Sequence, residues 1–97
     1  MNFILNGYDY KDEKSLERRM AAREGHVKNI EAMKNDKKVL MACAMLNSDG
    51  NMCGSTLILE MENKDAVDEY LKTEAYVLEK VWERVEVIEC KIPPMFL

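Results

Sequence analysis

The pattern of apolar residues along the chain is typical of strands in some segments and of helices in others. Residues 2–8 begin with apolar and aromatic side chains and end in polar, turn-like ones, which predicts a strand. In residues 13–35 the apolar positions recur at helical spacing, namely at Leu16, Met20, Val27, Ile30 and Met33. We therefore predict one long helix there, capped at its start by Asp12 or Ser15.

The next segment, residues 38–46, is apolar at every position after Lys38. A strand with one face in water would alternate, so this strand is expected to be covered on both faces. Residues 47–51 contain Asp49-Gly50, a strong hairpin-turn signal. Residues 53–62 then read as the returning strand.

Residues 63–81 show helical spacing again, in two pieces, the second at about residues 74–80. Either Asn63 or Asp65 can cap the first piece. Residues 82–92 predict the last strand, with Trp82 as a packing anchor.

The predicted order of elements is β-α-β-β-α-β, which indicates an α+β fold of the ferredoxin-like type in one domain, residues 1–97. Four antiparallel strands would carry both helices on one face. The other face needs a cover, as the all-apolar second strand also indicates. We therefore predict a homodimer in which the sheets of two copies face each other.

Composition narrows the class of protein. The 97 residues are 47% hydrophobic and 33% charged, with a net charge of −4 and the two signs interspersed. These values are typical of a globular protein and argue against a nucleic-acid partner. The chain shows neither a signal peptide nor an apolar run of about 18 residues, so we expect no membrane partner. Cys43, Cys53 and Cys90 form no CxxC pair, which favours reduced thiols in a cytoplasmic protein without a metal site.

The only histidine, His26, lies on the long predicted helix. Helical geometry places His26 and Arg19 on the same edge of the apolar stripe, and Arg23 nearly at its centre. In one interpretation His26 is a boundary residue and Arg23 a structural salt-bridge donor. In the other, His26 exchanges protons and needs a nearby carboxylate. Candidates for that carboxylate are Asp9, Asp12 and Glu74.

Other motifs are weaker. Gly54-Ser55 at the start of the third strand is either simple turn chemistry or a donor at the rim of a pocket. The chain has no nucleophile-elbow sequence and no glycine-rich phosphate loop, which argues against a serine hydrolase and a nucleotide-binding enzyme.

Three features together resemble the YciI-like (YCII-related) family over nearly the whole chain. They are the R-x3-R-x2-H spacing of Arg19, Arg23 and His26, the Gly54-Ser55 strand start, and the acid-x-Tyr of residues 74–76. The resemblance implies a dimeric ferredoxin-like α/β barrel with a histidine–aspartate pair in a pocket. Members typically have Asp-Pro-Tyr where this chain has Glu74-Ala75-Tyr76, so the carboxylate here is one methylene longer and lacks the adjoining proline. A characterised relative is a dehydrochlorinase, and muconolactone isomerases share the barrel.

The resemblance implies a small lyase or isomerase that needs no cofactor and acts on a cyclic or aromatic metabolite. His26 would be the general acid–base and Glu74 its orienting carboxylate. Arg19 or Arg23 would hold substrate charge, and the remaining substrate-binding candidates are Ser55 and Tyr76. The alternative is a non-catalytic dimeric module that binds a metabolite in the same pocket.

Overall fold

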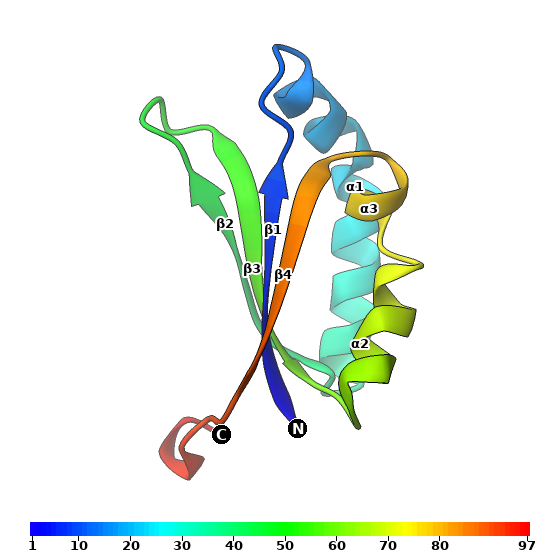
Figure 1. The fold of residues 1–97 in the computed structure, drawn as a ribbon, viewed down its shortest axis with the longest axis vertical. Helices are drawn as coiled ribbons and strands as arrows, with labels where there is room; N and C mark the ends of the chain where they lie inside the picture. Colours follow the sequence, from blue (N-terminus) through cyan, green and yellow to red (C-terminus); the bar gives the residue numbers. More distant parts are fainter.

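The structure is a computed structural model that describes residues 1–97. It consists of a four-stranded antiparallel sheet with helices covering one of its faces (Figure 1). The elements are β1 (Asn2–Asp9), α1 (Ser15–Asn35), β2 (Val39–Leu46), β3 (Met52–Glu60), α2 (Lys64–Leu71), α3 (Ala75–Leu78), β4 (Trp82–Cys90) and the 3-10 turn η1 (Pro94–Phe96). The strand order is β2-β3-β1-β4. The predicted α+β, ferredoxin-like fold is therefore confirmed. No helix is long and apolar enough to cross a membrane.

The central strand β1 pairs with both β3 and β4 and alternates strictly between a buried and a half-buried face. Its buried face points to the helices and includes Phe3, Leu5 and Asp9. Gly7 lies on this face, and a Cβ atom there would come within 2.3 Å of the Trp82 ring. Because glycine leaves that space, the buried indole of Trp82 can lie across β1.

The hydrophobic core fills the layer between the sheet and the helices. Its buried members are Phe3, Leu5, Val39, Leu57, Leu59, Met61, Val67, Tyr70, Tyr76, Val81 and Trp82. Helix α2 begins after Asn63, whose Oδ1 accepts the backbone N–H of Ala66 at 2.9 Å, so Asn63 is the cap. The hairpin turn predicted at Asp49-Gly50 is present, with Gly50 at φ +79°.

Helix α1 presents to the sheet only part of the apolar face that its spacing predicts, namely Ile30 and Met33, which pack against the core. Its buried residues are Arg19 and His26, whereas Met20 is 51% exposed and Val27 is 40% exposed. Arg23, expected at the centre of the stripe, is exposed. This prediction was wrong because polar partners on other elements receive the two buried polar side chains.

The start of α1 also differs from the prediction. The helix begins at Ser15, and the residue at its N-cap position, Lys14, makes no side-chain capping bond. Asp12 instead accepts the backbone N–H of Lys14 at 2.9 Å and binds Arg18. Neither of the two proposed caps, Asp12 or Ser15, therefore caps this helix.

Strand β2 is an edge strand, and most of its side chains are exposed in the isolated chain. The chain thus does not itself cover β2 on both faces, as its apolar sequence would require. The face of the sheet away from the helices carries a row of apolar residues in register, Met41, Ile58, Ile4 and Ile88. The predicted dimer stays a prediction at this point.

Candidate functional site

His26 of α1 and Glu74, the residue just before α3, meet although 48 residues separate them in the chain. Glu74 Oε1 lies 2.5 Å from His26 Nδ1. The side chain of Glu74 is fully buried, and His26 is only 8% exposed. Where the carboxylate accepts this bond, Nδ1 carries the proton and Nε2 is the second, free ring nitrogen.

Three donors hold the Glu74 carboxylate. Besides His26, the Tyr76 backbone N–H donates to Oε1 at 3.2 Å, and the Tyr70 hydroxyl donates to Oε2. The bond from the Tyr76 backbone N–H also makes Glu74 the side-chain cap of α3. Burial, with the charge of Glu74 and the hydrogen bond to it, raises the pKa of Tyr70, so the phenol stays a donor. The Glu74 side chain is thus held in place by donors at both of its oxygens.

Two aromatic rings fix the plane of the imidazole. The Tyr76 ring stacks on His26 with centroids 3.9 Å apart and planes 11° apart. Trp82 lies edge-on to both rings, at 6.0 Å from His26 and 5.6 Å from Tyr76. The pKa of the Tyr76 phenol is raised, chiefly by burial and against the effect of the Arg19 charge. The imidazole is therefore held in one orientation.

Arg19 forms a second buried polar cluster with Asp9 and Ser55. Its Nη1 donates to both Asp9 oxygens, at 2.9 and 3.1 Å, and its Nη2 donates to Ser55 Oγ at 2.6 Å. The guanidinium lies 4.7 Å from the centroid of the Tyr76 ring. Burial raises the pKa of Asp9, although the neighbouring Arg19 charge acts in the opposite direction. Asp9 thus neutralises Arg19 rather than pairing with His26.

The sequence leaves three carboxylates as candidate partners of His26, and in the structure each of them has a different partner. Asp9 binds Arg19, and Asp12 binds Arg18 at the surface, with 2.7 Å between Arg18 Nη2 and Asp12 Oδ2. Glu74 is the one that reaches the imidazole.

A cavity of about 220 Å³ opens beside His26. The residues that line it come from α1, β2, β3 and α3: Arg19, Arg23, His26, Val27, Ile30, Ala42, Cys43, Ala44, Met52, Ser55, Leu57 and Tyr76. Every site residue proposed from the sequence lines this cavity except Glu74, which contacts His26 from the buried side. Arg23 is exposed and makes no ion pair within the chain. Of the two arginines, Arg23 is therefore the one whose charge is free for a ligand.

Sequence reasoning missed part of this arrangement. The sequence predicts Asp9 only as a partner of His26 and Trp82 only as a packing anchor, and it assigns no part in the site to Tyr70. A signal for Tyr70 exists, because it precedes Glu74 by four residues, a spacing that brings side chains together along a helical path. No group of three or more histidine, cysteine, aspartate or glutamate side chains lies close enough together to hold a metal ion.

Comparison with known proteins shows the family of this chain. A family model described as the YCII-related domain matches residues 1–91. The chain belongs to the YCII-related domain family. Relatives in this family include the protein YciI of Escherichia coli O6:H1 and that of Shigella flexneri. Each is 29% identical over 93 residues, which cover 90% of this chain and 93% of the relative.

Two solved structures share the fold. One is a 5-chloro-2-hydroxyhydroquinone dehydrochlorinase from Burkholderia phenoliruptrix AC1100 in complex with 2,5-dihydroxybenzoquinone, with a TM-score of 0.85, 23% identity and 98% of both chains covered. The other is a dimeric ferredoxin-like protein of unknown function from Jannaschia sp. CCS1, with a TM-score of 0.52 and 12% identity, covering 94% of this chain and 98% of that one. At these identities the likeness shows the fold.

Proposed function

We propose that this member of the YCII-related family is a small enzyme in which His26 and Glu74 move a proton on a ring-shaped substrate. The observation that carries the proposal is the buried contact between Glu74 Oε1 and His26 Nδ1. It leaves Nε2 free to take a proton as a general base and to return it as a general acid. The negative charge of Glu74 stabilises the imidazolium formed in between. The reaction class is a lyase or isomerase that uses no cofactor.

The cavity supports a small, planar, anionic substrate. Its volume of about 220 Å³ is below the roughly 300 Å³ at which pockets for drug-sized ligands begin, so it suits a single ring. Arg23 supplies a free positive charge for a phenolate or carboxylate. Ser55 Oγ accepts a bond from Arg19, which leaves the serine hydroxyl proton for a substrate oxygen.

Arg19 and Tyr76 have supporting roles in this proposal. The charge of Arg19 is balanced by Asp9, so this arginine orients Ser55 and packs on Tyr76 rather than neutralising a substrate. The Tyr76 ring forms one wall of the cavity and keeps the imidazole plane fixed.

The dehydrochlorinase with the same fold supports a specific substrate class, chlorinated or hydroxylated benzenoid rings. Net loss of hydrogen chloride from a chlorinated ring with two hydroxyl groups turns both hydroxyls into carbonyls: one of their protons moves to the carbon that loses chlorine, the other goes to a base, and chloride leaves as an anion. The reaction consumes no oxidant or reductant, because both electrons of the broken carbon–chlorine bond leave with the chloride. A His26–Glu74 pair without a redox group suffices for this chemistry.

The proposed functional unit is a cytoplasmic homodimer joined through the sheet faces. Its support is the apolar row of Met41, Ile58, Ile4 and Ile88 on the uncovered face, together with the exposed apolar strand β2. The dimeric ferredoxin-like protein of the same fold is consistent with this assembly.

The experiment measures chloride release from 5-chloro-2-hydroxyhydroquinone and, separately, binding of 2,5-dihydroxybenzoquinone. His26→Gln is expected to lower kcat by about 100-fold or more, while the quinone still binds. Glu74→Gln removes the charge that stabilises the imidazolium and should also lower kcat. Glu79→Gln is the control, because Glu79 lies at the end of α3 but is exposed, makes no ion pair and is away from both the cavity and the proposed dimer face. Binding without chloride release in the unaltered protein would instead favour the non-catalytic binding module.

A further inference from the structure

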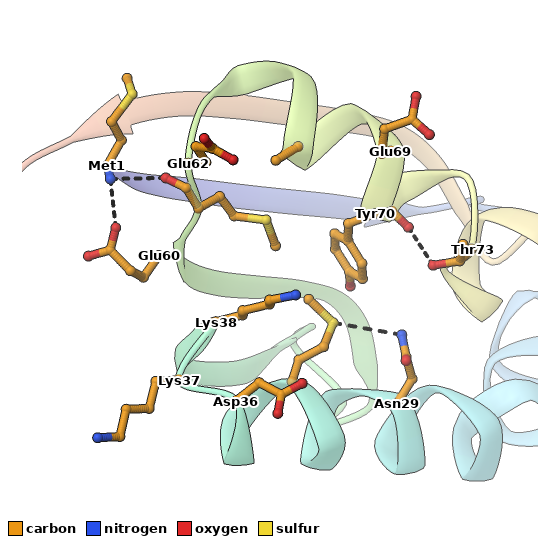
Figure 2. A pocket seen from close by; sticks show the side chains of 13 residues that line it. Met1, Asn29, Asp36, Lys37, Lys38, Glu60, Glu62, Glu69, Tyr70 and Thr73 are labelled. Atoms are coloured by element: carbon orange, nitrogen blue, oxygen red, sulfur yellow. Dashed lines mark hydrogen bonds and ion pairs between the residues drawn. The ribbon is translucent and has the colours of Figure 1, made fainter.

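Tyr70 of α2 lies next to the candidate site without lining its cavity. It lines a different and larger groove of about 1020 Å³ between α1 and α2, together with Asn29, Met33, Lys38 and Met61. Figure 2 shows the phenol ring pointing from α2 towards α1 inside this groove. The side chain is 7% exposed, so its hydroxyl needs a partner inside the protein.

That partner is the carboxylate of the proposed catalytic pair. The Tyr70 hydroxyl donates to Glu74 Oε2, and the other oxygen of the same carboxylate contacts His26 Nδ1. A glutamate side chain has three rotatable bonds, and a contact at Oε1 alone leaves the carboxylate free to turn about that oxygen. A second donor at Oε2 removes this freedom.

We propose that Tyr70 is a positioning residue, whose hydroxyl holds Glu74 Oε2 and so keeps Oε1 on His26 Nδ1. This inference rests on the proposed function of the His26–Glu74 pair. Tyr70 touches neither the cavity beside His26 nor a substrate in it, and it acts through Glu74 alone. The backbone supports the arrangement, because Thr73 Oγ1 donates to the Tyr70 carbonyl oxygen at 2.8 Å and ties the end of α2 to the turn that carries Glu74.

The test follows the proton on His26 Nδ1 by NMR and measures its rate of exchange with water. In Tyr70→Phe the carboxylate loses one donor, and we expect this exchange to become about tenfold faster or more. Tyr10→Phe is the control, because it also removes a tyrosine hydroxyl, but the Tyr10 ring lies against Arg18, at 5.5 Å, and not against the His26–Glu74 pair. Its His26 proton should exchange at the unaltered rate. The backbone amide of Leu5 in the core reports overall stability in the same spectra.

A positioning role predicts faster exchange at His26 with an unchanged rate at Leu5. Equal acceleration at both protons would show a general loss of stability and overturn the inference, as would an unchanged His26 rate. A slow-exchanging His26 proton in the unaltered protein with no response to Tyr70→Phe rejects Tyr70 but keeps the His26–Glu74 pair. If that proton is missing altogether, the proposed function fails first and the inference with it.

A second measurement applies if Tyr70→Phe does not fold. The hydroxyl proton of Tyr70 in the unaltered protein should give a downfield, slowly exchanging signal, because it is bound to a buried carboxylate. This signal should move upfield in Glu74→Gln, where the acceptor has no charge. A Tyr70 signal that is absent in the unaltered protein, or that keeps its position in Glu74→Gln, overturns the inference.

Discussion

The phenol ring of Tyr76 lies flat against the imidazole of His26, with 3.9 Å between centroids and 11° between planes. Tyr76 is also 1% exposed and belongs to the core, so it connects the candidate site to the stability of the fold. The Tyr76 ring therefore serves two purposes, and substitutions can separate them.

Tyr76→Ala should destabilise the protein by about 3–5 kcal/mol, because a buried aromatic ring is lost and a cavity is left. Tyr76→Phe keeps the ring and should cost much less. Urea unfolding measures both free energies. Equal losses for the two variants would show that the phenol oxygen, rather than the stacked ring, is what stabilises this site.

The buried pair of Arg19 and Asp9 should be strongly coupled. Arg19→Met or Asp9→Leu alone leaves one charge buried without its partner, and each should cost about 3–5 kcal/mol. The double variant leaves neither charge and should lose less than the sum of the two single losses. Arg18→Met is the matched control at the surface, where the ion pair with Asp12 is solvated and the effect should be small. Strict additivity in the double-mutant cycle would contradict the coupling.

Protonation of Asp12 should lower the stability of the protein in acid. Hydrogen bonds from Arg18 and from the Lys14 backbone lower the pKa of Asp12 from 3.8 to about 2. Because the folded pKa is the lower one, the ionised carboxylate stabilises the fold above 3.8, and this contribution is lost as the pH falls towards about 2.

Thermal unfolding as a function of pH measures this effect. The decrease in Tm over that acid range should be shallower in Asp12→Asn than in the unaltered protein. Asp36→Asn serves as the control, since Asp36 is an exposed carboxylate without an ion pair. An identical pH dependence of Tm in Asp12→Asn and the unaltered protein would mean that the Arg18 contact does not stabilise the charged form.

The uncovered sheet face should form the dimer interface. Sedimentation at micromolar concentration is expected to give a homodimer, and Ile88→Arg, which places a charge in the apolar row, is expected to give a monomer. Leu78→Arg is the control, because Leu78 is 61% exposed on α3, on the other side of the sheet. A monomer in the unaltered protein would contradict the proposed assembly.

The sequence was sufficient for the order of elements because the signals for them are local. The apolar and aromatic start of β1, the Asp49-Gly50 turn and Asn63, one of the two proposed caps of α2, each act within a few residues, and each lies where it was expected. Only boundaries moved, by a residue or two at most strand and helix ends.

Which side of α1 packs against the sheet could not be predicted in the same way. Hydrophobic spacing places Met20 and Val27 against the sheet, whereas the structure buries Arg19 and His26. Arg19 and His26 can be buried because they have hydrogen-bond partners on other elements. These partners are Asp9, Ser55 and Glu74. Such partners are distant in sequence, and no periodicity within one helix reports them.

The candidate site was predictable as a set of residues but not as a set of contacts. Resemblance to the family indicated His26 and Glu74, yet the part played by Tyr70 depends on the turn between α2 and α3. Likewise, Arg19 is neutralised and Arg23 is not because Asp9 lies next to Arg19, and the sequence does not show this position of Asp9.

The most direct test of the account is the protonation of the His26 ring, read from the ¹⁵N chemical shifts of its two nitrogens in the neutral form. We expect a proton on Nδ1, donated to Glu74, and a bare Nε2, the nitrogen that Glu74 does not contact, as the base. A proton on Nε2 with a bare Nδ1 would contradict the account, because the ionised Glu74 would then have nothing to accept from His26 and the ring would have no free base for a substrate.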